Sequence, residues 1–164
     1  MIVMEPVEDE IVLTPKGRKK IEDELDKLIT VDRHEVASRI RDAKDYGELT
    51  ENPEYESAKN AQAFIEGRIM DLKTILSRAR ELHEDQIPTD RVALGLKIAV
   101  RDLEFDDDWS LTLVSAYEAD PDADRISDMS PIGKALIGHR VGDTVTVNTP
   151  SGASRYEVLA ISHV

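Results

Sequence analysis

The sequence predicts an α+β protein made of an N-terminal antiparallel coiled-coil helical hairpin, residues 1–84, and a small C-terminal β-rich domain, residues 85–164. Three observations lead to this division. Apolar residues recur at helical spacing through the first half, an acidic stretch with one glycine interrupts them, and short β-like runs replace them after residue 88. An α-helix rises ~1.5 Å per residue, so helices of about 28 residues would carry the connecting stretch roughly 40 Å from the hairpin's other end.

The first helix is expected to begin at Thr14-Pro15. Threonine is a favourable N-cap, and proline is tolerated in the first turn because the N–H that it lacks would have no partner within the helix. An apolar stripe continues to about Lys44 and is interrupted around the polar residues 32–34. The stripe consists of Ile21, Leu25, Leu28, Val36, Ile40 and Ala43.

The chain is expected to turn back between the two helices, near Gly47. Glycine breaks a helix, and Asn52-Pro53 repeats the cap-plus-proline signal for a second start. The second helix has a heptad seam, with steps of three and four residues, and two such helices joined by a short loop form an antiparallel hairpin. The seam residues are Tyr55, Ala58, Gln62, Ile65, Ile69, Leu72, Leu76 and Ala79.

The second domain is expected to contain several short strands and one short helix. The helix would begin with Ser130 as cap and Pro131 in the first turn, and would stop at Gly138. Residues 149–152 form a turn signal between the last two strands. The expected strands are Val92–Val100, Leu111–Tyr117, Thr144–Val147 and Tyr156–Ile161.

The composition excludes several classes of site and partner. The chain has no cysteine, so disulfides, thiolate zinc sites and thiol chemistry are excluded, and its four histidines lack the spacing of metal ligands. A net charge of −13 argues against a protein that binds nucleic acid over its whole surface. No stretch approaches the ~20 apolar residues of a membrane span and no basic leader is present, so we expect a cytoplasmic protein that contacts no membrane.

Acidic side chains crowd the expected end of the hairpin. The helix dipole accounts for those at the start of the second helix, but Glu48 and Glu51 lie in the loop itself, three residues apart. Such a pair suits Mg²⁺, which takes one or two protein carboxylates and fills its other positions with water and phosphate oxygens. From the residues alone, metal assistance and a plain solvated tip both remain open. The acidic residues are Asp42, Asp45, Glu48, Glu51, Glu54 and Glu56.

Residues 47–55, GELTENPEY, resemble the tip motif of the Gre transcript-cleavage factors, usually Gly-Asp-Leu-Ser/Lys-Glu-Asn-Ala-Glu-Tyr. The motif falls between two coiled-coil helices, as in that family. The similarity spans nearly the whole chain, because it also covers LTPKGRKKIEDELDKL in the first helix, AKNAQAFIEGRI in the second, and SPIGKALIGHRVGDTVTVNTPSG and YEVLAI near the C-terminus.

The resemblance implies a partner and a site. The hairpin would enter the secondary channel of bacterial RNA polymerase, where Glu48 and Glu51 would help to hold the second catalytic Mg²⁺. The polymerase itself would then cleave the backtracked RNA, so the chain is not expected to be an enzyme, nor to hold Mg²⁺ when isolated. Arg41 and Lys44 are expected to contact phosphates at the nascent RNA 3′ end, or else to be ordinary charges of a solvated coiled coil.

For the second domain the resemblance implies an FKBP-like fold that docks on the rim of the channel. Ser130, Pro131 and Ile132 are the expected polymerase contact, although the first two also serve to cap a helix. The protein is expected to act as a monomer.

One departure from the family motif keeps a second function open. Glu48 stands where the family usually has Asp, and its carboxylate is one methylene further from the backbone. A metal-assisting carboxylate is sensitive to displacements of about 1 Å. The alternative is therefore a non-cleaving inhibitor that binds in the same channel; a structural hairpin adaptor would have no reason for paired carboxylates at its tip.

Overall fold

The computed structural model describes residues 11–46 and 51–164. The chain divides into two compact units: residues 18–79 form the first, and residues 11–17 together with 80–164 form the second. The expected domain limits at residues 84 and 85 stay a prediction. Within the described ranges, no helix is both long enough and apolar enough to cross a membrane.

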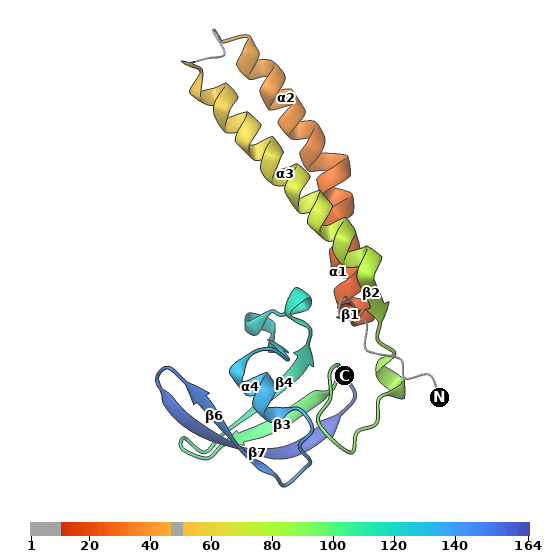
Figure 1. Cartoon of the computed structure of the whole chain (residues 1–164), viewed down its shortest axis with the longest axis vertical. Helices are drawn as coiled ribbons and strands as arrows, with labels where there is room; N and C mark the ends of the chain where they lie inside the picture. Colours follow the sequence, from red (N-terminus) through yellow and green to blue (C-terminus); the bar gives the residue numbers. More distant parts are fainter. Residues whose placement is uncertain (1–10, 47–50) are drawn as a thin grey trace, which may run out of the picture. The chain divides into compact units, whose positions relative to one another are not determined.

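The first unit is the predicted helical hairpin (Figure 1). Its first arm contains α1 (Pro15–Lys27), a π-helical turn (Leu28–Asp32) and α2 (Arg33–Lys44), and its second arm is α3 (Pro53–Arg78). Both predicted helix starts, at Thr14-Pro15 and Asn52-Pro53, are confirmed. The predicted break at Gly47 lies outside the described residues.

The π-helical turn accounts for the interruption in the first apolar stripe. Ile21, Leu28, Val36 and Ala43 are all buried, and they are separated by seven, eight and seven residues. The eight-residue step holds one residue more than a heptad. A π-helical turn accommodates an extra residue because its hydrogen bonds run from i to i+5, and this one returns Val36 to the buried side.

The predicted seam of the second helix is confirmed from Tyr55 to Leu76, whereas Ala79 follows the last residue of α3 and begins a strand. Ala58, Ile69 and Leu72 are almost fully buried, and the other predicted seam residues are half-buried. Burial of these side chains is the main source of the hairpin's stability, since each large apolar residue removed from water contributes about 1.5–3 kcal/mol.

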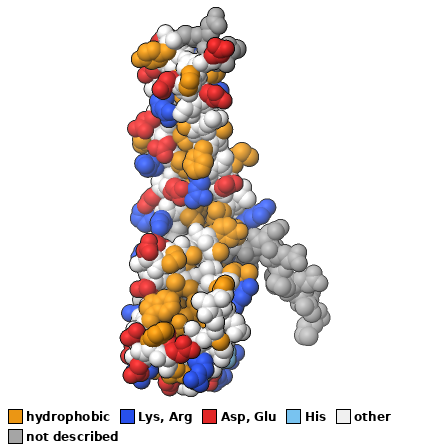
Figure 2. All heavy atoms as spheres, turned by 90° about the vertical axis from the view of Figure 1, so that its left-hand side faces the viewer, with side chains coloured by type: hydrophobic (Ala, Val, Ile, Leu, Met, Phe, Trp, Pro, Cys, Tyr) orange, Lys and Arg blue, Asp and Glu red, His pale blue; other side chains and the backbone are white. Residues whose placement is uncertain are grey.

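Two ion pairs join the arms on the flanks of this seam. The guanidinium of Arg33 donates to Glu66 at 2.8 and 2.9 Å, and that of Arg68 donates to Glu24 at 2.7 and 3.1 Å. Basic and acidic side chains alternate along the hairpin face shown in Figure 2. Because these pairs are about half exposed, they fix the register of the arms more than they stabilise them.

The second unit is built on a five-stranded sheet with the order β5-β4-β3-β7-β6, antiparallel except for the pair β4–β5. A separate two-stranded sheet pairs β1 with β2. The strands are β1 (Ile11–Leu13), β2 (Ala79–Glu81), β3 (Lys97–Asp102), β4 (Asp107–Val114), β5 (Arg125–Ser127), β6 (Thr144–Thr149) and β7 (Gly152–Ser162). Short 3₁₀ turns cover Glu84–Gln86, Ala116–Glu118 and Pro121–Ala123.

The strand predictions are confirmed in type but two are wrong in extent. The run Leu111–Tyr117 was predicted as one strand, but β4 ends at Val114 and a 3₁₀ turn follows it. The run Val92–Val100 contains a turn before β3 begins at Lys97, and Gly95 in that turn has φ +89°, which suits glycine. Val92 and Leu96 are nevertheless buried in the core. An apolar run thus identified core residues correctly and strand residues only in part.

The predicted short helix is confirmed as α4 (Pro131–Leu136), with Ser130 as N-cap and Gly138 just beyond its end, and it packs against β6 of the sheet. A Cβ on Gly133 would clash with the backbone oxygen of Ser127, so glycine permits this close approach. The core contains Val92, Leu96, Ile98, Val100, Leu111, Leu113, Ile126, Leu136, Val145, Val147 and Val158.

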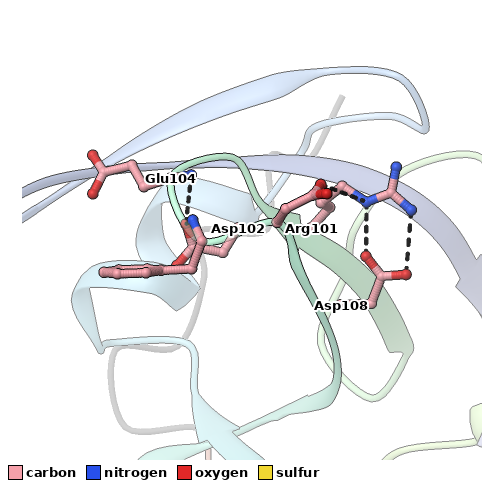
Figure 3. Close-up of polar contacts among 6 residues, drawn as sticks. Arg101, Asp102, Glu104 and Asp108 are labelled. Carbon is pink, nitrogen blue, oxygen red and sulfur yellow. Dashed lines mark hydrogen bonds and ion pairs between the residues drawn. The ribbon is translucent and has the colours of Figure 1, made fainter.

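The acidic residues 106–108 form the end of the turn and the first residues of β4 in the β3–β4 hairpin (Figure 3). Arg101 donates to both carboxylate oxygens of Asp108, at 2.8 and 3.3 Å, and its Nε lies 4.0 Å from Asp106. The carboxylate of Asp102 accepts from the backbone N–H of Glu104 at 2.9 Å. The acidic run is thus part of a closed turn.

A buried polar cluster that the sequence did not reveal surrounds Thr14. The Thr14 backbone N–H and hydroxyl donate to the carboxylate of Glu118 at 2.8 and 2.6 Å, and Arg125 forms an ion pair with the same carboxylate. The Thr14 hydroxyl also accepts from the N–H of Gly17 at 3.1 Å. A Cβ on Gly17 would collide with the Glu118 carboxyl group, so glycine leaves the room that this cluster needs.

Candidate functional site at the hairpin tip

Asn52 organises the described part of the tip. It has extended backbone angles, φ −99° and ψ 102°, and its Oδ1 accepts from the backbone N–H groups of Glu54 and Tyr55 at 3.1 and 3.3 Å. Pro53 follows in the first helical position. This satisfies two of the N–H groups that the start of a helix leaves without partners.

The other end of the same amide reaches the opposite arm. Asn52 Nδ2 donates to the backbone oxygen of Ala43, in the last turn of α2, at 2.7 Å. That oxygen also accepts from the N–H of Tyr46 at 3.2 Å, so both of its lone pairs are used. Asn52 is 9% exposed, and its partner Ala43 is buried as well. One side chain therefore ties the end of α2 to the start of α3.

Of the predicted metal-assisting pair, Glu51 is among the described residues and Glu48 is not. Glu51 is exposed, directly precedes the fixed Asn52, and makes no hydrogen bond or ion pair with another residue that the structure describes. Glu48 lies outside the described residues. The exposed residues Glu54 and Glu56 occupy the first turn of α3, where the helix dipole favours a negative charge, as expected.

The chemistry of Glu51 fits one ligand of a shared magnesium site. A free exposed carboxylate offers hard oxygen ligands, which Mg²⁺ prefers. No group of three or more His, Asp or Glu side chains in residues 11–46 and 51–164 is arranged to hold a metal. Among the described tip residues, Glu51 is a carboxylate with no basic partner and could offer one such oxygen ligand.

Basic residues lie on the last turns of α2. The predicted RNA-contacting residues, Arg41 and Lys44, are both exposed, and neither forms an ion pair with a described residue. Their position at the C-terminal end of the helix is also favoured by its dipole. The structure thus leaves both cations accessible to a negatively charged ligand.

A shallow hollow beside these residues was not predicted. Its lining includes Arg39, Asp42, Ala43, Tyr46 and Glu54, from both arms of the hairpin. Tyr46 is 81% exposed. Neither the hollow nor the Asn52–Ala43 bond follows from helix periodicity, because each depends on how the two arms approach one another.

The predicted polymerase-contacting residues lie at the start of α4 in the second unit. Ser130 Oγ accepts from the N–H of Gly133 at 3.1 Å and donates to the oxygen of Ser127 at 2.6 Å, which confirms its capping role. Pro131 is exposed and Ile132 is half-buried against the core. The cap leaves Pro131 on the surface, so the capping role and a contact role are compatible.

Comparison with known proteins assigns both halves of the chain to one family. The family model described as "Transcription elongation factor, N-terminal" matches residues 11–80, and that described as "Transcription elongation factor, GreA/GreB, C-term" matches residues 87–163.

Individual relatives agree with the family models. The chain is 47% identical over 152 residues to "Transcription elongation factor GreA" of Acetivibrio thermocellus, covering 93% of this chain and 96% of the relative. It is 48% identical over 153 residues to the protein of the same name from Alkaliphilus oremlandii, with the same coverage. Among solved structures, the GreA factor homolog 1 (Gfh1) of Thermus thermophilus is 34% identical, covers 93% of this chain and 98% of its own, and superposes with a TM-score of 0.43. The chain belongs to the GreA/GreB family of transcription elongation factors.

Proposed function

We propose that this elongation factor rescues arrested transcription by stimulating the cleavage of backtracked RNA within RNA polymerase. The observation that carries the proposal is the tip: Asn52 fixes both arms of the hairpin, and the adjacent Glu51 presents a free carboxylate. The tip motif at residues 47–55 and the relatives named GreA agree with it. The chain supplies ligands in trans and has no nuclease activity of its own.

The hairpin delivers the carboxylates to a confined site. Two helices packed along one seam form a narrow rod, which suits entry into the secondary channel of the polymerase. At the polymerase active site, Glu51 and Glu48 would complete the ligand set of a second Mg²⁺ that is shared with the polymerase. Such an ion stabilises the attacking and leaving oxygens of an in-line displacement at phosphorus.

Arg41 and Lys44 would act on the nascent RNA 3′ end. Both are exposed cations on the tip-proximal turns of α2, in a protein whose overall charge is strongly negative. Contacts from such residues to phosphates position an RNA without reading its sequence. They would hold the extruded 3′ end beside the tip carboxylates.

The second unit would dock on the polymerase at the rim of the channel through Ser130, Pro131 and Ile132. Large apolar side chains are exposed directly on both sides of α4: Met129 is 62% exposed and Ile137 is 43% exposed. These two exposed side chains leave apolar surface available for a contact with the polymerase. In this arrangement the protein acts as a monomer in the bacterial cytoplasm.

A cleavage factor is favoured over a channel-blocking inhibitor. Relatives named GreA are 44–48% identical to the chain over more than 90% of its length. The Glu at position 48 keeps the carboxylate that metal assistance requires, although on a longer side chain.

The test uses a backtracked elongation complex with labelled RNA. The protein is added with Mg²⁺, and RNA length is followed on a gel, with a parallel reaction that contains RNA but no polymerase. We expect the RNA to shorten only when polymerase and protein are both present. RNA that stays uncut, together with slower nucleotide addition, would instead identify a channel-blocking regulator.

A further inference from the structure

Asn52 is the only described residue whose side chain hydrogen-bonds to both ends of the hairpin turn. Its Oδ1 accepts from two N–H groups at the start of α3, and its Nδ2 donates to Ala43 in the last turn of α2. Its neighbours on either side, Glu51 and Pro53, are exposed, whereas Asn52 is 9% exposed. The side chain is thus turned inward, between the two arms.

We propose that Asn52 is the positioning residue of the tip: its amide holds the two arms together and thereby fixes the place of the adjacent Glu51 carboxylate. The inference deepens the proposed cleavage function and rests on it. Asn52 itself has no contact with metal or RNA in this account and acts only through Glu51.

The chemistry of the amide explains why the position requires asparagine. The cap needs an oxygen acceptor, which Asp and Ser also provide, and which makes all three residues good N-caps. The bond to Ala43 needs an N–H donor on the same short side chain, and a carboxylate has none. Aspartate or serine would therefore keep the cap and lose the link between the arms.

The link matters because metal assistance depends on position more than on stability. Glu51 is joined directly to Asn52, so a shift of Asn52 relative to α2 displaces the Glu51 carboxylate by a similar amount. A displacement of about 1 Å in a catalytic group lowers a rate by as much as about 100-fold. The expected loss is in the cleavage rate, while entry of the hairpin into the channel needs only the folded rod.

The experiment compares the wild type with Asn52→Asp and Asn52→Ser in the backtracked-complex assay. Two quantities are measured for each: the affinity for the elongation complex, by competition, and the cleavage rate at saturating protein over a range of Mg²⁺ concentrations. We expect both variants to bind as the wild type does, to cleave about 10-fold more slowly, and to need more Mg²⁺ for half-maximal rate. A purely structural role would lower the affinity and leave the Mg²⁺ requirement unchanged.

Asn60→Asp is the matched control, because Asn60 is an exposed residue of the same helix and the substitution adds the same charge. It is expected to behave as the wild type. If Asn52→Asp is slow while Asn52→Ser is normal, the effect is one of added charge and the proposal is overturned. It is also overturned if both variants cleave normally. A wild type that does not cleave would instead refute the proposed function.

Discussion

The helix starts at Asn52 and Thr14 carry the same sequence signal, a capping residue followed by proline, yet different partners hold them. Asn52 is bound by neutral backbone groups nine residues away or closer. Thr14 is bound by a buried ion pair, Glu118 with Arg125, more than 100 residues along the chain. The cap signal therefore predicts where a helix begins, and it does not predict which groups secure that beginning.

The two helix starts should also lose different amounts of stability when one partner is removed. A buried ion pair becomes costly when one partner is removed, because the other charge stays buried and unpaired. A neutral cap loses only its hydrogen bonds. The helix start at Asn52 is of the neutral kind, and the adjacent carboxylate of Glu51 has no basic partner among the described residues.

Replacing Arg125 by methionine is expected to have the largest effect on stability. The side chains of Glu118 and Arg125 are 2% and 13% exposed, so the substitution leaves a buried carboxylate without its cation and should cost about 3–5 kcal/mol. The measurement is urea unfolding followed by the fluorescence of Trp109, the single tryptophan, which lies in β4 of the second unit. Arg140→Met, at an exposed position, is the control and should stay within about 0.5 kcal/mol of the wild type. Equal effects of the two substitutions would contradict the comparison.

Asn52→Ala is expected to have a smaller effect, about 1–2 kcal/mol, because it removes a cap and one cross-arm bond without stranding a charge. Thermal unfolding followed by circular dichroism at 222 nm reports on the hairpin, which holds most of the helix. Asn52→Ser keeps an oxygen that can cap α3, so it should recover the part of the lost stability that is due to the cap. If Asn52→Ala lowers the free energy of unfolding as much as Arg125→Met does, the helix start at Asn52 is held as strongly as the start at Thr14, which would contradict the comparison.

The smallest effect is expected at an exposed ion pair, Arg101 with Asp108 (Figure 3). The hydrogen bonds from Arg101 hold the pKa of Asp108 below its usual range. The resulting stabilisation is fully present above the unfolded pKa, about 3.9, and is lost as the pH falls through the lower folded pKa. The urea midpoints of the wild type and Arg101→Gln should therefore differ slightly at pH 7 and converge below about pH 4. A difference between the two urea midpoints that grows as the pH falls would contradict this expected pH dependence.

Much of the fold could be predicted because its signals are local. The seam from Tyr55 to Leu76, the caps at Asn52 and Ser130, and the apolar strands depend on neighbouring residues and on periodicity. The strand β5 (Arg125–Ser127) was missed because three residues carry too little pattern. The pairing of β1 with β2, and the burial of Glu118, depend on contacts between distant parts of the chain, which a single sequence does not encode visibly.

The candidate site, too, was predicted from local sequence signals only in part. The composition of the tip, and its likeness to the family motif, identified Glu51 and Asn52 as residues of interest from the sequence. The bond from Asn52 to Ala43 and the exposure of Tyr46 required the two arms to be placed side by side. The role of Glu48 stays a prediction from the resemblance.

The most direct test of the central claim separates binding from cleavage. A Glu48→Ala, Glu51→Ala double variant is compared with the wild type on a backtracked complex in the presence of Mg²⁺, with affinity for the complex measured in the same preparation. We predict unchanged affinity and loss of RNA shortening, because the tip carboxylates complete the metal ligands without holding the protein in place. Shortening that persists in the double variant, at equal affinity, would contradict the account.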